Sequence, residues 1–228
     1  MDAARIAATI GLPTAAPRAR VSVEGRPALV YPEITGRSLA VTIRKQPLSA
    51  ARLLGEMATL HHAVHRHAIT GLRTVRSVLL TDIDYGPAPA PLKRAAASYL
   101  QDLPDADRLL HGDFHIDNIV VRDQALIILD WAKAAMGDPA ADVVRSEMLM
   151  RFGEGPADPI TTLWRDWAAQ RLIKAYRHQG ALSAERLSAW RPIVALAWLR
   201  ARPAVRNRAF HAYLNRALSA AGLPAFTP

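Results

Sequence analysis

The chain has 228 residues, half of them hydrophobic, and a formal net charge of +9. This length is sufficient to bury a large core, as one large domain or as two lobes. The absence of cysteine excludes disulfide bonds, thiolate zinc sites and a cysteine nucleophile. No segment approaches the length of a membrane span, and no basic run precedes an apolar stretch near the first residue, so we expect a cytoplasmic protein that does not enter the membrane.

The first predicted elements are one helix and one β-hairpin. Apolar residues recur at helical spacing over residues 2–10, and Gly11-Leu12-Pro13 ends this helix because proline cannot continue it. Residues 20–23 and 28–31 flank a short turn and predict two antiparallel strands. A turn-rich segment follows them.

The middle of the chain predicts two helices and a second hairpin. Ser49 is a candidate N-cap for a helix that extends to about His67, and another helix is expected at residues 92–100. The apolar runs 119–121 and 126–129 flank a polar turn and predict two paired strands.

The rest of the chain is expected to be helical and carries the excess positive charge. Residues 1–158 contain 18 basic and 18 acidic residues, whereas residues 159–228 contain 11 basic residues against Asp166 and Glu185. We interpret most of these arginines as a solvated helix face, so nucleic acid is not an expected partner. The helices are expected from Pro139 to about Phe152, from Asp158-Pro159, after Ser183, and from about Val205 to Ala221.

A candidate catalytic centre lies between the two groups of helices. Residues 111–118 (HGDFHIDN) fit the pattern H-x-D-x-x-x-x-N, and Asp130 ends the second hairpin twelve residues later. Phosphoryl transfer from ATP needs a carboxylate that orients or accepts the proton of the acceptor hydroxyl, and oxygen ligands that hold Mg²⁺ on the phosphates. Asp113, Asn118 and Asp130 can supply these groups to one cleft.

Three separated motifs carry a family resemblance. The sequences HGD-x4-N at residues 111–118, LDW at 129–131 and GDPAAD at 137–142 resemble the signature of aminoglycoside phosphotransferase and choline kinase-like small-molecule kinases. Residues 11–13 and 29–39 resemble the last strands and hinge of the N-terminal lobe in that family, and the resemblance extends over about residues 3–152.

The resemblance implies a fold. That fold is α+β and protein-kinase-like: a mostly helical C-lobe with a catalytic-loop β-hairpin, and a remnant of the N-lobe sheet. We therefore expect an N-lobe remnant and hinge at residues 1–36 and a helical C-lobe with the catalytic and metal-binding loops at residues 37–228.

The resemblance also implies roles for individual residues. Asp113 is expected to be the catalytic base, and Asn118 and Asp130 are expected to bind Mg²⁺, with Asp130 also serving the nucleotide. His111 and Asp142 are expected to brace the catalytic loop. Together these residues predict a kinase that moves the γ-phosphate of ATP to the hydroxyl of a small molecule.

The nucleotide is expected at the hinge, where the backbone near Val30, Tyr31 and Glu33 would hold adenine. In the family a Gly-rich loop, a strand lysine and a helix glutamate precede the hinge, whereas Lys45 and Glu56 follow it here. We therefore expect a late start codon or a natural remnant, and weak binding and slow turnover of ATP by this chain.

Two other interpretations stay open at this point. His111, Asp113 and His115 alternate as H-x-D-x-H and could hold the metal of a hydrolase. A catalytically impaired, pseudokinase-like binding protein is the second alternative. His61 and His65 form an i, i+4 pair, which we expect at the edge of the core and on the surface.

The predicted acceptor is a neutral or anionic hydroxyl compound. In the family the C-terminal helices wall the acceptor pocket, and acidic side chains concentrate polycationic acceptors there. Here basic residues dominate that region, so a polyamine would be repelled. The sequence gives no indication of the oligomeric state. The prediction rests on Arg165, Arg171, Arg177, Arg200, Arg202, Arg206 and Arg208.

Overall fold

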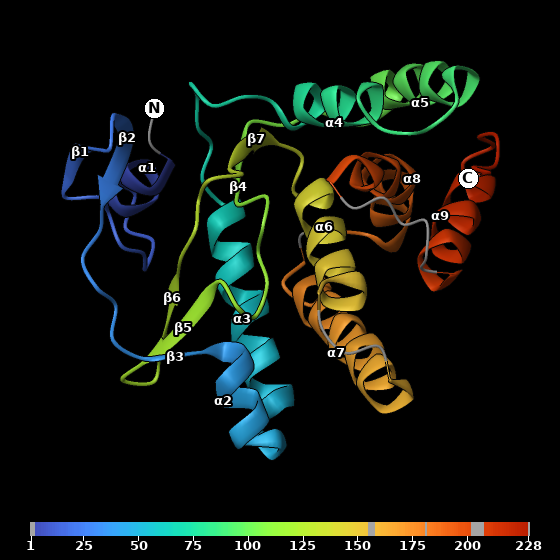
Figure 1. Ribbon diagram of the computed structural model, residues 1–228. Helices are drawn as coiled ribbons and strands as arrows, with labels where there is room; N and C mark the ends of the chain where they lie inside the picture. The colour runs from blue at the N-terminus through green and yellow to red at the C-terminus, as the bar shows by residue number, and fades with distance from the viewer. Residues whose placement is uncertain (1–2, 155–157, 181, 202–207, 228) are drawn as a thin grey trace.

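The computed structural model describes residues 3–154, 158–180, 182–201 and 208–227. A small N-terminal part lies beside a larger helical part (Figure 1), and it consists of α1 (Ala3–Thr9), β1 (Ala19–Val23) and β2 (Arg26–Val30). β1 and β2 pair antiparallel, as predicted. Their two-residue turn, Glu24 and Gly25, has φ angles of 50° and 75°, which match the backbone twist that short hairpins require.

Two small antiparallel sheets separate this part from the helices (Figure 1). One has the order β3-β5-β6 and contains the second predicted hairpin, and the other pairs β4 with β7. The strands are β3 (Arg37–Ser38), β4 (Arg108–Leu110), β5 (Ile119–Arg122), β6 (Ala125–Ile128) and β7 (Ala135–Gly137).

This pairing brings two loops together. Residues 111–118 connect β4 to β5, and residues 129–134 connect β6 to β7. Because β5 pairs with β6 and β4 pairs with β7, both ends of each loop are held beside the ends of the other. The two segments singled out in the sequence therefore lie next to each other.

The helices form the core. α6 lies between α7 and α8 and is buried on most sides, while α3 packs against α7. The helices are α2 (Leu39–Lys45), α3 (Ala50–His65), α4 (Val75–Asp84), α5 (Ala90–Asp102), α6 (Pro139–Phe152), α7 (Pro159–Arg177), α8 (Ala184–Ala201) and α9 (Arg208–Ala220). None of the helices in the described ranges is both long and apolar enough to cross a membrane.

The predicted α+β architecture is confirmed, with differences at the short elements. Ser49 ends a 3-10 turn and makes no capping hydrogen bond to α3. α2 and α4 were not predicted, because 7 and 10 residues offer little periodicity, although Ser38 and Thr74 cap them through their hydroxyls. The residues expected to begin the last helix near Val205 lie outside the described ranges.

Asp138 joins the start of α6 to α8. Its carboxylate is fully buried; Oδ1 accepts a hydrogen bond from the N–H of Ala140 at 2.8 Å and so caps α6. Oδ2 accepts from Arg186 at 2.7 and 2.9 Å and from the indole N–H of Trp190 at 3.2 Å. One side chain thus fixes the angle at which two core helices meet.

Replacing Asp138 with alanine is expected to lower the free energy of unfolding by about 3–5 kcal/mol, because the change removes a helix cap and leaves Arg186 without its buried partner. Urea denaturation of the purified protein measures this loss. Asp84→Ala, at an exposed acid on α4, is the control and is expected to change stability by less than about 0.5 kcal/mol. Equal effects of the two substitutions would contradict the anchoring role.

Candidate active site

His111 links the two loops. Its imidazole is fully buried, with Nε2 at 2.9 Å from the carbonyl oxygen of Leu129 and Nδ1 at 3.2 Å from the backbone nitrogen of Asp113. Nε2–H therefore donates to Leu129, and Nδ1 accepts from the Asp113 N–H. Burial lowers the pKa of His111, in keeping with a neutral ring. Both ring nitrogens are occupied.

This tautomer is inconsistent with the hydrolase interpretation, which needs His111 as a metal ligand. Within the described ranges, His111, Asp113 and His115 also do not gather their ligand atoms around one point. The H-x-D-x-H alternation is therefore a structural coincidence of the loop.

Asp113 is a buried carboxylate held through one oxygen. Oδ2 lies 3.0 Å from the ammonium nitrogen of Lys133 and 3.5 Å from the amide nitrogen of Asn118. Oδ1 is buried and has no hydrogen-bond partner among the described residues. Lys133 was not predicted as a site residue, because no motif marks a lysine three positions after Asp130.

Asn118 and Asp130 lie at adjacent positions of the two loops. The side-chain amide of Asn118 donates to the backbone carbonyl oxygen of Asp113 at 3.0 Å, and the backbone carbonyl oxygen of Asn118 accepts from the N–H of Leu129 at 2.8 Å. Asp130, the next residue, is exposed and has a φ of 58°, an unusual backbone conformation for a residue other than glycine. Strained residues of this kind gather at functional sites.

Asp142 holds the start of residues 111–118, the predicted catalytic loop. Its Oδ2 accepts from the backbone N–H of His111 at 2.7 Å, and its Oδ1 accepts from the N–H of Gly112 at 2.8 Å. The ring Nε2 atoms of His61 and His65 both lie 3.1 Å from Oδ2. Asp142 thus accepts hydrogen bonds from the backbone of residues 111 and 112, with two histidines of α3 as additional donors.

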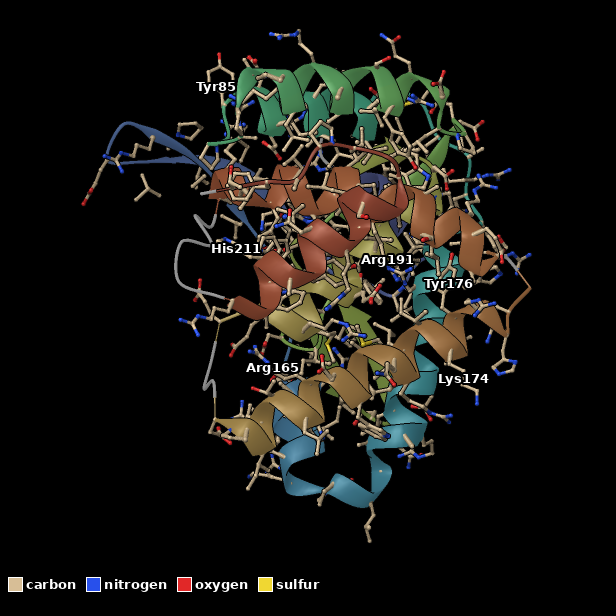
Figure 2. All side chains as sticks on the ribbon, turned by 90° about the vertical axis from the view of Figure 1, so that its right-hand side faces the viewer. Tyr85, Arg165, Lys174, Tyr176, Arg191 and His211 are labelled. Carbon is tan, nitrogen blue, oxygen red and sulfur yellow. The ribbon has the colours of Figure 1, made fainter. Side chains whose placement is uncertain are left out.

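The prediction that His61 and His65 lie at the core edge and surface was wrong, because both side chains are buried against Asp142. Tyr176 projects from α7 toward α3 (Figure 2), with its hydroxyl 2.7 Å from Nδ1 of His65. These three groups, two histidines and one aspartate, have ligand atoms within 4.8 Å of one another. Since both Nε2–H groups already donate to the carboxylate, their lone pairs do not converge on a metal.

The protonation states of this cluster follow from burial and pairing. Burial and the neighbouring His65 lower the pKa of His61 to about 4, so its ring is neutral. Burial by itself would raise the pKa of Asp142, but the hydrogen bonds from the two histidines hold that pKa well below its usual value. The cluster is a single buried charge with N–H donors around it.

Gly112 sits where the two loops touch. Its φ is 77°, and a Cβ at this position would collide with the carbonyl oxygen of Lys133. The guanidinium of Arg145 on α6 also donates to the carbonyl oxygen of Gly112. Only glycine fits here, and the close approach fixes the backbone of Lys133 relative to the catalytic loop.

A cleft of about 1430 Å³ opens between the N-terminal part and the Asp130 loop. Its lining comes from residues 3–34, 71–73 and 129–134 and includes the charged side chains of Arg5, Arg20, Arg73 and Asp130. Asp113 and Asn118 do not line it, although Asp113 contacts Lys133 of the 129–134 loop that borders it.

Of the three predicted hinge residues, Tyr31 lines the cleft, whereas Val30 and Glu33 are not part of its lining. Leu29, Pro32 and Ile34 line it as well. The segment predicted to hold a nucleotide therefore borders the cleft through some of its residues.

Within the described ranges, the C-terminal arginines do not line this cleft. Figure 2 shows Arg165, Lys174 and Arg191 on the C-terminal helices, the side opposite β1 and β2. Arg165 donates to the carbonyl oxygens of Gly153 and Glu154. Arg171 donates to the carbonyl oxygen of Ala51, and Arg200 pairs with Asp82. Arg177 and Arg208 are exposed, and Arg202 and Arg206 lie outside the described ranges.

The chain matches the phosphotransferase enzyme family over residues 1–176. It therefore belongs to this family, as its motifs predicted. Among curated proteins, acyl-CoA dehydrogenase family member 11 of Gallus gallus is 36% identical over 81 residues, which cover 34% of this chain and 10% of that protein. The matched part is thus a small fraction of that relative.

Solved structures confirm the protein-kinase-like fold. An aminoglycoside-3'-phosphotransferase of type VIII has a TM-score of 0.59 at 18% identity, covering 85% of this chain and 77% of that one. A choline/ethanolamine kinase family protein from Mesorhizobium loti has a TM-score of 0.54 at 19% identity, over 96% and 76%. The aminoglycoside phosphotransferase APH(4)-Ia, in a ternary complex with AMP-PNP and hygromycin B, has a TM-score of 0.65 at 16% identity, over 96% and 80%.

Acidification is expected to destabilise the protein in two steps. The pKa of His61 is about 4 when folded, against 6.5 for a free histidine, so the unfolded chain binds a proton first as the pH falls. Stability is therefore complete above pH 6.5 and declines toward pH 4, by about 3 kcal/mol from this residue. His111 acts in the same direction, and Asp142 adds a further loss below about pH 4.

Denaturant titrations at pH 7, 5.5 and 4.5 measure the first step. His61→Gln keeps a neutral donor near Asp142 and is expected to be less stable at pH 7 but to show a weaker decline on acidification. An unchanged slope in the variant would show that His61 is not the titrating group.

Proposed function

We propose that this protein transfers the γ-phosphate of ATP to the hydroxyl group of a small molecule. The observation that carries this proposal is the position of Asp113, Asn118 and Asp130 on two adjacent loops that His111 holds together. A hydroxyl-orienting carboxylate and two oxygen-bearing side chains are the groups that this reaction requires. The solved structure of APH(4)-Ia with AMP-PNP and hygromycin B offers a precedent for such a pair of ligands on this fold.

The donor set fits Mg²⁺. Asp130 presents an exposed carboxylate at the cleft, and the amide of Asn118 donates its N–H to Asp113, which leaves the amide oxygen for a cation. Hard oxygen ligands of this kind suit magnesium. When bound, the ion would neutralise phosphate charge during transfer. We propose Asn118 and Asp130 as its protein ligands.

Asp113 is proposed as the base. Because Oδ1 is buried, Oδ2 is the oxygen that an acceptor hydroxyl can reach. The acceptor oxygen bonds to the γ-phosphorus, the bond from that phosphorus to the β,γ-bridging oxygen breaks, and its electron pair leaves with ADP. The acceptor proton passes to Oδ2 of Asp113, which yields a phosphate ester and ADP.

The nucleotide is proposed to bind in the cleft. Tyr31, Pro32 and Ile34 offer backbone and apolar surface for adenine, and Arg5, Arg20 and Arg73 supply positive charge near Asp130. Under this proposal residues 1–36 and 37–228 form the two walls of the nucleotide site. The backbone near Val30 and Glu33 remains part of the proposed hinge.

The acceptor is proposed to be a neutral or anionic small molecule. Of the arginines first used for this prediction, those in the described ranges do not line the cleft, so they do not support it. The charged side chains that line the cleft do support it, because they are three arginines and one aspartate. A polycationic acceptor would find little to attract it.

Asp113→Ala is expected to reduce phosphotransfer by at least about 100-fold without changing the affinity for Mg-ATP, because it removes the proton acceptor and no nucleotide contact. A coupled ADP-release assay over a panel of sugars, nucleosides, hydroxy acids and aminoglycosides measures the rate. Asp117→Ala, at an exposed acid of the same loop, is the matched control and is expected to retain activity. Full activity of Asp113→Ala would refute the assignment of the base.

Asp130→Asn is expected to weaken Mg-ATP binding by about tenfold or more, because an amide replaces a charged ligand. Calorimetric titration with Mg-ATP and with metal-free ATP separates this effect from a general loss of nucleotide affinity. The expected change is confined to the magnesium-dependent part. If both titrations weakened equally, Asp130 would be a nucleotide contact and not a metal ligand.

A further inference from the structure

Lys133 makes the only ion pair to Asp113 within the described ranges, at 3.0 Å from Oδ2. The aspartate side chain is 11% exposed and the lysine side chain is 54% exposed, so the ammonium caps a buried carboxylate from the solvent side. Because burial of a lone carboxylate is costly, this cation offsets part of the cost of burying Asp113.

The position of Lys133 is imposed by the backbone. The Lys133 carbonyl abuts Gly112, the N–H of Ala134 donates to Trp131 at 3.0 Å, and Ala135 pairs with Leu110 across β4 and β7. The lysine Cα is therefore fixed beside the catalytic loop from both chain directions. The contact with Oδ2 therefore costs only the conformational entropy of the lysine side chain, because the backbone is already fixed.

The pair also constrains the acceptor. A hydroxyl that donates to Oδ2 approaches an oxygen that already accepts from Lys133. Since each hydrogen bond spans about 3 Å, the hydroxyl oxygen of the substrate lies within about 6 Å of the lysine ammonium. Every acceptor in the proposed reaction therefore places its reacting hydroxyl close to the ammonium group of Lys133, which is paired with the base.

We propose that Lys133 positions Asp113 and selects acceptors by charge: it disfavours a hydroxyl compound with an ammonium group near the reacting oxygen and admits neutral or acidic ones. This inference rests on the proposed phosphotransfer and adds the residue that sets its specificity. An ammonium group on the acceptor that comes within about 6 Å of the Lys133 ammonium would change the relative rate by on the order of tenfold.

The test compares three acceptors that share ring hydroxyls and differ in charge: glucose, glucosamine and glucuronate, within the broader acceptor panel. Lys133→Met removes the cation and keeps much of the length of the side chain. It is expected to raise the ratio of kcat/KM for cationic to neutral acceptors by on the order of tenfold. The kcat for neutral acceptors falls because Asp113 loses its partner, and the KM for Mg-ATP does not change.

Lys133→Arg restores a cation and is expected to return both the charge ratio and kcat toward the wild-type values. Lys45→Met, at an exposed lysine on α2, is the matched control and leaves the ratio unchanged. Thermal denaturation shows whether each variant is folded. A merely structural role for Lys133 would lower activity for all acceptors alike, without a shift in the charge ratio.

The outcomes separate this inference from the proposed function. If wild-type protein transfers phosphate and Lys133→Met keeps the wild-type charge ratio, the inference is overturned and the proposed function stands. If folded wild-type protein transfers phosphate to no acceptor in the panel, both are overturned. A shifted ratio in Lys133→Met with recovery in Lys133→Arg supports the inference.

Discussion

The buried carboxylate of Asp142 is the constraint on which the site depends. It stays charged inside the core because four N–H groups donate to it, two from histidine rings and two from the backbone of the catalytic loop. Charge-assisted hydrogen bonds of this kind contribute about 1.5–3 kcal/mol each. Through them α6 fixes the loop, the loop fixes His111, and His111 fixes Leu129 and hence Asp130. Removing the carboxylate would release the whole sequence of contacts.

The sequence indicated the candidate site and two of its supports, His111 and Asp142, but not the histidine partners of Asp142 or Lys133. Asp113, Asn118 and Asp130 could be named because three motifs occur in a fixed order, and a short motif records local backbone geometry. The partners of Asp142 could not, because His61 lies 81 residues away and its helix has ordinary apolar spacing. Lys133 was missed because its position depends on the pairing of β4 with β7. Strands of three residues are too short to be predicted from a sequence pattern. The helical layout was predicted well, since long periodic segments and proline or glycine boundaries carry that information locally.

Part of the excess positive charge has a structural explanation. Some arginines of residues 159–228, which carry the excess, donate to backbone carbonyl oxygens, which are dipoles without net charge. Arg165 reaches Gly153 and Glu154, and Arg171 reaches Ala51. Such hydrogen bonds satisfy the carbonyl oxygens of helix ends and loops without adding an acidic residue to the total. A high net charge in an arginine-rich helical protein is therefore weak evidence for a nucleic-acid partner.

Asp138 and Asp142 are separated by one turn of α6, and their tasks point in different directions. The first caps the helix and reaches α8, while the second reaches the catalytic loop and α3. Between them, Ala140 and Ala141 are buried, with 0% and 2% exposure, which excludes larger side chains. An insertion or deletion of a single residue in this turn would rotate Asp142 by about 100° relative to Asp138 and separate the two tasks. The geometry therefore constrains the number of residues between Asp138 and Asp142 more strictly than their chemical nature. A gap at this turn in an aligned sequence would mark a protein whose site is supported differently.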